Sequence, residues 1–386
     1  MLKGEEMTYE SAELKDELIL FRKTVRRFIE ERFVPHQDNW ERQHRPDAEA
    51  WRQAGATGLL LTDIQEQYGG SGGSIAHEVV VVEELARAGV HFGATVQSIA
   101  AHYILDYGTE DQKKRLLPQM ASGELIGAIA MTEAGAGSDL QNIKTRAMRD
   151  GIQYIINGGK TFITNGWHAG VVVLAVKTDI SISGPRGISM MVVETKDLAG
   201  YTVGKPLEKI GMQTQDTCEL FFDNVRVPAD RLLGGSEGKG FSQMMSQLPY
   251  ERLLIAALAV ATSERALLIT SKYAKEREAF GAPLIDLQNT RFQLAECKAD
   301  VDIGRVFLDK CIQDYCAGHV DPVATATAKY WTTESESRIL DKCLQIHGGY
   351  GYMKEYPIGR MWTDSRVHRI YSGSNEIMKE IIGASL

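Results

Sequence analysis

The first part of the chain has the apolar periodicity of α-helices. Between Phe21 and Phe33, apolar side chains recur mostly three or four positions apart, with arginines and glutamates between them. The segments "WRQAGATGLL" and "VVVVEELARAG" predict two more helices, separated by the loop "EQYGGSGGS". A further helix is expected to end before Gly108, and "TEDQKKRLLPQMASGE" predicts a short helix with Thr109 as its N-cap. We therefore expect an N-terminal α-helical domain over residues 1–125.

From about Ile126 the pattern changes to short runs of β-branched and aromatic residues. These runs are "IGAIAMTE", "IQYIING", "KTFITNG", "VVVLAVK", "ISMMVVE" and "CELFFDNVRV". The pairs Asp150-Gly151 and Asn157-Gly158 punctuate them and predict hairpin turns. We expect a middle antiparallel β-domain over residues 126–238, ending near "LGGSEGKG".

The helical period returns at Phe241 and continues to the end of the chain. "ERLLIAALAVATSERALLITSKYAKER" carries alanine and leucine on several faces, which predicts a long helix buried on more than one side. Pro249 is expected to kink or begin it. Two more long helices are expected over residues 288–317 and 322–347, and a short one over 376–382. The sequence thus predicts an α+β fold that ends in a C-terminal helical bundle over residues 239–386.

Composition and charge exclude several classes of function. With 44% hydrophobic and 24% charged residues, the chain is typical of a globular protein. The net charge of -8 argues against a nucleic-acid partner, because phosphate binding needs a basic face. No run of 18 consecutive apolar residues is present, so no membrane span is expected. The polar, acidic start "MLKGEEMTYESAELKDE" differs from a secretory leader or a transit peptide.

Cysteine and histidine spacing argue against a disulfide framework and against a metal site. The five cysteines are an odd number without CxxC spacing, which favours reduced thiols and a cytoplasmic location. No HExxH or similar ligand spacing occurs, so no metal is expected. "GGSGG" fits GxSxG but follows no apolar strand, and no GxGxxG follows one either. A nucleophile elbow and a Rossmann-bound nicotinamide cofactor are therefore disfavoured.

Two stretches in the β-region are suited to a flat or phosphorylated ligand. "MTEAGAGSD" (Met131–Asp139) has small residues that let the backbone approach a ligand, and it adds the hydroxyls of Thr132 and Ser138. "NGGKTFITNG" places Phe162 on a neighbouring run. Taken singly, the first stretch is explained about as well by an irregular turn, and Phe162 is more often a core aromatic than a ring-stacking residue.

Together with three further stretches, these motifs resemble the acyl-CoA dehydrogenases. The others are the opening helical stretch, "EREAFGAPLIDLQ" and "QIHGGYGYMKEYPIGRMWTDSRV", and the resemblance spans nearly the whole chain. The predicted order of helical, β and helical domains agrees with that family's fold. The resemblance implies an FAD-dependent oxidoreductase of fatty acid β-oxidation, which removes hydrogen from the α and β carbons of an acyl-CoA thioester.

The resemblance also implies which residues hold FAD. On one side of the flavin it places Met131, Thr132 and Ser138, with Phe162 packing on the isoalloxazine and Thr164 bonding its edge. Residues of a neighbouring subunit are implied at the pyrophosphate, namely Arg277, Phe280, Gln288, Gln345, Gly348 and Gly349. Ser374 and Glu376 stand at positions that contact the dinucleotide in relatives. Sharing FAD implies an obligate homodimer, which the family usually doubles to a homotetramer, with an electron-transfer flavoprotein as electron acceptor.

The catalytic base of most relatives is missing from "RIYSGSNEIMKEII", because Ser372 follows Tyr371 where a glutamate usually stands. In the long-chain and isovaleryl types the base lies instead on the long helix of the C-terminal domain. "QLPYERLLIAA" resembles that arrangement and implies Glu251 as the base. The alternative for Glu251 is a solvated or salt-bridged residue at a helix start. Glu376 is a rival, although its position implies that it faces the adenine side of FAD.

The implied acyl-binding residues surround the vacated position. They are Ser138, Arg252, Tyr371, Ser372 and Gly373, with the Ser372 backbone N–H as a donor to the thioester carbonyl. Arg252 either orients Glu251 or the ligand, or forms a structural ion pair. The helix over residues 95–105 is expected at the pocket floor. Acyl length, branching, and CoA versus a carrier-protein thioester stay open.

Two other readings remain at this point. One is an oxygen-using flavoprotein of the same fold, either an acyl-CoA oxidase or a flavin monooxygenase. The other is a cofactor-binding scaffold without turnover. Oxygen uptake separates the first from a dehydrogenase, and absence of flavin bleaching by acyl thioesters would identify the second.

Overall fold

The computed structural model describes residues 16–386, so most of the acidic amino-terminal stretch lies outside the described residues. The described chain begins with helices α1 (Asp16–Arg32), α2 (Gln37–Gln43), α3 (Ala48–Ala56), α4 (Ile75–Ala88), α5 (Ala94–Tyr107) and α6 (Glu110–Ala121). The predicted cap of α6 is confirmed, because the Thr109 hydroxyl accepts a hydrogen bond from the backbone N–H of Gln112 at 3.3 Å. The stretch "GGSGG" lies in the loop before α4, as expected.

A sheet follows the six helices. It contains β1 (Ile126–Ala130), β2 (Arg146–Asp150), β3 (Gln153–Thr164), β4 (Ala169–Lys177), β5 (Ile188–Glu194), β6 (Tyr201–Val203) and β7 (Thr217–Pro228). The strand order is β1-β4-β2-β3-β7-β6, and β5 pairs with β4. The hairpin predicted at Asp150-Gly151 joins β2 to β3. The sheet is mainly antiparallel, as predicted. It departs from that pattern at β1, which pairs with β4 in parallel, and at Arg146 of β2, which also meets β4 in parallel.

The turn predicted at Asn157-Gly158 is also wrong. These two residues lie inside the continuous strand β3, where the pairing with β7 shifts register between Ile156 and Gly158. A glycine is required at this irregularity, because a Cβ on Gly158 would lie 2.6 Å from the Cα of Thr145. The Asn-Gly pair therefore marks a bulge beside a crowded neighbour instead of a chain reversal.

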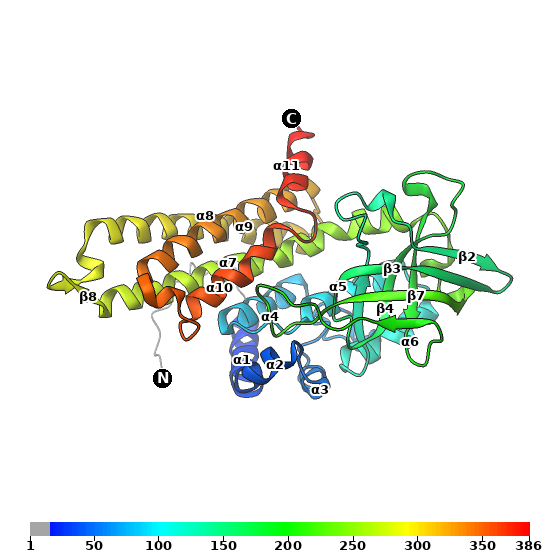
Figure 1. Cartoon of the computed structure of the whole chain (residues 1–386), viewed down its shortest axis with the longest axis horizontal. Coiled ribbons are helices and arrows are strands. Elements are labelled where there is room, and N and C mark those ends of the chain that lie inside the picture. Colours follow the sequence, from blue (N-terminus) through cyan, green and yellow to red (C-terminus); the bar gives the residue numbers. More distant parts are fainter. Residues whose placement is uncertain (1–15) are drawn as a thin grey trace.

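The last part of the chain is helical, as predicted. It consists of α7 (Gly240–Glu276), α8 (Gln288–Cys316), α9 (Pro322–His347), α10 (Pro357–Ser365) and α11 (Asn375–Gly383), with a small hairpin of β8 (Glu278–Ala279) and β9 (Ala282–Pro283) between α7 and α8. Helix α7 begins at Gly240, so Pro249 lies inside it and does not begin it. In Figure 1 the long helices lie side by side at one end of the molecule, the sheet lies at the other, and α7 runs between them above α1 to α4.

Helix α7 packs against N-terminal helices, a strand of the sheet and the other long helices of the bundle. Its residues join a buried cluster with α1, α4, α5 and β5, and a second one with α8 and α9. By length and composition α7 is apolar enough to cross a membrane, but 67% of its most apolar window is buried within the protein. A core helix passes the same test, so this is weak evidence for a membrane span. The predicted burial of α7 on more than one side is confirmed.

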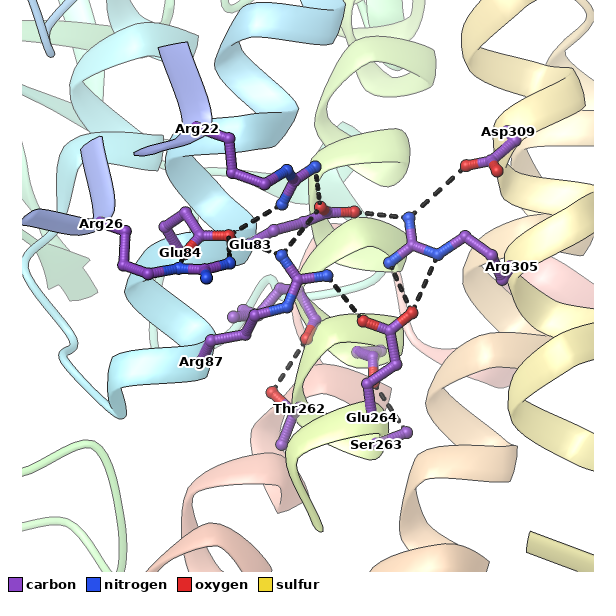
Figure 2. Close-up of polar contacts among 12 residues, drawn as sticks. Arg22, Arg26, Glu83, Glu84, Arg87, Thr262, Ser263, Glu264, Arg305 and Asp309 are labelled. Carbon is purple, nitrogen blue, oxygen red and sulfur yellow. Dashed lines mark hydrogen bonds and ion pairs between the residues drawn. The ribbon is translucent and has the colours of Figure 1, made fainter. Parts of the chain in front are cut away.

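A network of buried ion pairs fixes the N-terminal helices against the bundle (Figure 2). Glu83 of α4 contacts Arg22 of α1 at 2.7 Å and Arg305 of α8 at 2.5 Å. The Arg305 guanidinium also lies 2.9 Å from Glu264 of α7, to which Arg87 of α4 makes a second bridge at 2.7 Å. Burial opposes ionisation of Glu83, but Arg305, Arg22 and Arg87 outweigh it and lower the pKa of that carboxyl.

We expect Arg305→Met to destabilise the protein by about 3 kcal/mol, because it leaves Glu83 and Glu264 buried with less compensation. The control is Arg338→Met, which removes a half-exposed pair with Asp300 and should cost less than about 1 kcal/mol. Urea unfolding midpoints at pH 7 measure both changes. Equal midpoints for the two variants would contradict the proposed importance of the network.

Candidate active site

Glu251 lies on α7 with both carboxylate oxygens in contact with other elements. The residue is 6% exposed. Its Oε1 accepts a hydrogen bond from the Tyr103 hydroxyl of α5 at 3.3 Å, and its Oε2 accepts one from the Ser372 hydroxyl at 3.3 Å. The serine that replaces the usual glutamate therefore touches the carboxylate predicted to act in its place. The helix that carries Tyr103 was expected at the pocket floor, but the sequence did not single out this fully buried tyrosine.

This environment brings the titration of Glu251 close to neutral pH. Burial raises its pKa to about 7, although the hydrogen bonds from Tyr103 and Ser372 and the charge of Arg252 act to lower it. A buried carboxyl of this kind is a candidate proton acceptor, because its proton affinity is matched to neutral conditions. The alternative of a solvated helix-start residue is wrong, since Glu251 is buried well inside α7.

Arg252 is buried beside Glu251 but makes no ion pair with it among residues 16–386. Its Nε is enclosed and has no hydrogen-bond partner in the described part of the chain. Burial lowers its pKa, while the charge of Glu251 acts in the opposite direction. The structural ion pair considered for Arg252 is thus not formed, and the guanidinium keeps unused donors near the carboxylate.

The turn that carries Ser372 has an unusual backbone. Ser372 and Gly373 both adopt left-handed conformations, with φ of 51° and 85°, and such strain is often stored at functional sites. Lys329 of α9 holds this turn, because its Nζ donates to the carbonyl of Gly373 and to Oδ1 of Asn375, both at 2.9 Å. Burial and then the charge of Arg252 lower the pKa of Lys329 to about 7. Lys329 was not predicted, since a lysine within a helical pattern is usually solvated.

Tyr371 lies next to this turn and stacks on His368, with ring centroids 5.7 Å apart and planes inclined by 14°. His368 in turn contacts Glu336 of α9 through its Nδ1 at 2.9 Å. Ser374 stands at the N-cap position of α11, and Glu376 lies exposed in the first turn of that helix. The pKa of Glu376 is lowered by hydrogen bonds from its own backbone N–H and from Ser374. Glu376 is therefore held at the start of α11 and exposed, unlike the buried carboxylate of Glu251.

The first set of predicted flavin residues gathers at the ends of β1 and β3. The Thr132 carbonyl accepts the backbone N–H of Thr161 at 3.0 Å, which places the loop after β1 beside Phe162 and Thr164. Phe162 is 67% exposed and has a left-handed φ of 60°. Ser138 is exposed on the same loop, and Met131 is half-buried.

A buried ion pair that was not predicted holds this loop in place. Lys160 of β3 donates to the Met131 carbonyl and to Glu133, both at 2.8 Å. Glu133 also accepts the backbone N–H groups of Lys144 and Thr145. Lysine and glutamate within a strand-and-loop pattern give no signal of burial, so only the folded chain identifies the pair.

The second set of predicted flavin residues lies at the opposite end of the molecule. Arg277 and Phe280 follow α7, Gln288 begins α8, and Gln345, Gly348 and Gly349 end α9. The guanidinium of Arg277 lies 5.8 Å from the Tyr350 ring, and Phe280 is 97% exposed. The β8–β9 tip and the sheet are far apart in Figure 1, so one chain does not bring the two sets together. No group of His, Cys, Asp or Glu among residues 16–386 is arranged to hold a metal.

Comparison with known proteins decides the family. Residues 15–124 match the model of the acyl-CoA dehydrogenase N-terminal domain, residues 128–225 that of the middle domain, and residues 238–386 that of the C-terminal domain. The chain belongs to the acyl-CoA dehydrogenase family. It is an oxidoreductase with that family's three-domain fold of helical, β and helical parts.

Individual acyl-CoA dehydrogenases match almost the whole chain. The mitochondrial long-chain specific acyl-CoA dehydrogenase of Sus scrofa is 45% identical over 370 residues, which are 95% of this chain and 86% of the relative. The mitochondrial isovaleryl-CoA dehydrogenase of Solanum tuberosum is 33% identical over 372 residues, covering 95% and 89%. The crystal structure of an acyl-CoA dehydrogenase from Geobacillus kaustophilus has a TM-score of 0.95 at 44% identity, covering 97% of this chain and 99% of the other.

Because folding raises the pKa of Glu251 from 4.5 to about 7, this group favours the folded state below pH 4.5 and loses that contribution as the pH rises to 7. We expect Glu251→Gln to be more stable than the wild type by about 3 kcal/mol at pH 8 and by less than about 1 kcal/mol at pH 5. The exposed Glu380→Gln is the control, with changes within about 0.5 kcal/mol. Urea midpoints at the two pH values test this, and a difference independent of pH would contradict it.

Proposed function

We propose that this acyl-CoA dehydrogenase converts an acyl-CoA thioester to the trans-2-enoyl-CoA, with Glu251 as the base that removes the proton from Cα. The observation that carries the proposal is the buried carboxylate of Glu251, held by Tyr103 and Ser372 at 3.3 Å each. Ser372 itself is far too weak a base for this step. A serine at the usual position of the base and a buried glutamate in contact with it together support the assignment.

The two hydrogen bonds leave Glu251 able to accept a proton. Each carboxylate oxygen has two lone pairs, so one donor per oxygen leaves a free position on each. Tyr103 and Ser372 hold the group from α5 and from the turn before α11, and this fixes the direction in which the free positions point. Entry of an acyl chain removes water from the site and raises the proton affinity of Glu251 further.

The Ser372 turn supports a role in binding the thioester carbonyl. Among residues 16–386 the backbone N–H of Ser372 makes no backbone hydrogen bond, and the turn is fixed by Lys329. A preorganised donor at the carbonyl oxygen stabilises the negative charge that develops as Cα loses its proton. Ser138, Arg252, Tyr371 and Gly373 are proposed to line the remainder of the acyl thioester site.

The exposed side chains at both predicted sets fit FAD. Phe162 presents an exposed aromatic ring next to the loop of Met131, Thr132 and Ser138, with Thr164 beyond it on the same strand. A Cβ on Gly348 or Gly349 would meet nothing within 4 Å, so this segment leaves room for a ligand. When bound, FAD accepts the hydride from Cβ. We propose that one subunit holds FAD through the residues at the ends of β1 and β3 together with Ser374 and Glu376. The partner subunit would contribute the second set, namely Arg277, Phe280, Gln288, Gln345, Gly348 and Gly349.

This arrangement requires at least a homodimer, and we propose a dimer or a dimer of dimers. An electron-transfer flavoprotein is the proposed acceptor of the electrons. The five free cysteines support the predicted cytoplasmic location, since four of them are buried and none is paired. Domain boundaries after residues 125 and 238 stay predictions, and they fall between α6 and β1 and between β7 and α7.

We expect Glu251→Gln to bind FAD but to lose dehydrogenation by about 100- to 10,000-fold, because the base is removed without a change in shape. Anaerobic bleaching of the flavin by acyl-CoA and reduction of an artificial electron acceptor measure the loss. Ser372→Glu in the same protein should restore part of the activity. Near-wild-type turnover of Glu251→Gln would end the assignment, and rapid oxygen uptake by the wild type would favour an oxidase instead.

We expect Tyr103→Phe to move the acid limb of the kcat/KM profile to higher pH. The Tyr103 hydroxyl stabilises the ionised form of Glu251, so its loss raises the pKa of the base and a higher pH is needed to ionise it. Tyr107→Phe is the matched control, since Tyr107 lies on the same helix with its ring 6.3 Å from Tyr103. Identical profiles for the wild type and both variants would show that Tyr103 does not tune the base.

A further inference from the structure

A cleft of about 190 Å³ lies between the N-terminal helices and the bundle, away from the contacts of Glu251 described above. Gln37 of α2, Gly89 and His91 after α4, Arg265 of α7, and Arg360 and Asp364 of α10 are among its lining residues. The cleft is thus built from segments far apart in the sequence. Its walls carry several charged groups, and their pairing shows what the cleft is suited to bind.

Most of these charged groups already have partners. His91 Nε2 lies 2.9 Å from Asp364, whose other oxygen accepts the backbone N–H of Met212. Arg360 donates to Glu41 at 3.0 Å. Lys354 and Glu355, which also line the cleft, are exposed to solvent. Asp364 therefore already receives two donors, and it is the carboxylate shared by the positive groups His91 and Arg265 of the cleft.

Arg265 differs from these groups. Among residues 16–386 its guanidinium makes no hydrogen bond and no ion pair, and the residue lines the cleft. Burial and the charge of Arg360 lower its pKa, with Asp364 acting in the opposite direction. The guanidinium fills space that Gly89 leaves open, since a Cβ on Gly89 would lie 2.1 Å from Arg265 Nη1. A largely desolvated cation that makes no ion-pair contact is costly, and an anion in the cleft would offset that cost.

We propose that this cleft binds a compact oxyanion, a carboxylate or a phosphate group, on the guanidinium of Arg265. The planar fork of an arginine matches two oxygens of such a group, and Arg360 adds positive charge beside it. The cleft volume admits one small anionic group. It is too small for a nucleotide, because ligand pockets of that kind usually measure about 300 Å³ or more.

The oxyanion has two sources that the structure allows: free phosphate, or a carboxylate at the far end of a substrate acyl chain. Thr262 lines the cleft and follows Glu251 by eleven residues on α7. That separation is about three helical turns, so both lie on one face of α7 roughly 16 Å apart along its axis. His368, which also lines the cleft, stacks on Tyr371 next to Ser372. A long acyl chain directed along this face would end at Arg265, and this second source rests on the proposed function.

Titration of the FAD-loaded enzyme with inorganic phosphate tests the first source. Calorimetry should show that the wild type binds phosphate and that the affinity of Arg265→Met is at least about tenfold lower. The affinity of Arg265→Lys should be intermediate, because lysine keeps the charge but not the planar fork. Arg338→Met, on an exposed pair outside the cleft, is the control and should bind as the wild type does. Circular dichroism and flavin content confirm that each variant is folded.

Comparison of acyl-CoAs of matched chain length, with and without a terminal carboxylate, tests the second source. A preference for the carboxylated substrate that falls at least about tenfold in Arg265→Met supports the tethered carboxylate. Phosphate binding that depends on Arg265, without such a preference, supports a free-anion site. If the wild type shows neither effect, or if Arg265→Met retains both, the proposal is overturned. The phosphate titration needs no turnover. Its result is therefore still valid if Glu251→Gln proves active and Glu251 is not the base.

Discussion

The burial of one carboxylate on the central helix is the constraint on which the rest of this structure depends. Glu251 is removed from water, yet both of its oxygens receive a hydrogen bond, one from α5 and one from the turn before α11. Its pKa is near neutral because burial and these two donors act in opposite directions. The proposed chemistry needs this balance, since an exposed glutamate would be too weak a base and a buried one without donors would not ionise.

The rest of the molecule keeps these three elements together. Arg305 and Glu264 tie α8 and α7 to Glu83 on α4, and α4 packs beside the helices that carry the N-terminal core. Lys329 anchors the Ser372 turn to α9 from the other side. The first anchor joins buried charges, so the loss of one partner is strongly disruptive. The second joins the buried Lys329 to the Gly373 carbonyl and the Asn375 amide oxygen. Polar contacts from α4, α8 and α9 therefore help to hold the elements around this carboxylate in place.

The sequence predicted the helices and most strands because their signals are local. The capping pattern at Thr109 and the apolar period of α7 need only neighbouring residues, and both predictions are confirmed. The prediction failed where the deciding contact is distant. Asn157-Gly158 resembles a hairpin turn, but in the fold it lies within β3 because Thr145 packs closely against Gly158. The parallel pairing of β1 was missed for the same reason, since its partner β4 is separated from it by a hairpin.

At the candidate site the division is equally clear. The sequence alone identified the family motifs and the serine at the usual position of the base, and it predicted Glu251 as the replacement. It did not reveal Tyr103, which lies 148 residues from Glu251, or Lys329, whose burial contradicts the usual place of a lysine. The sequence itself contains the identity of each side chain and the local apolar period. Burial, hydrogen-bond partners and the resulting proton affinities exist only once distant segments pack, so only the tertiary structure decided them.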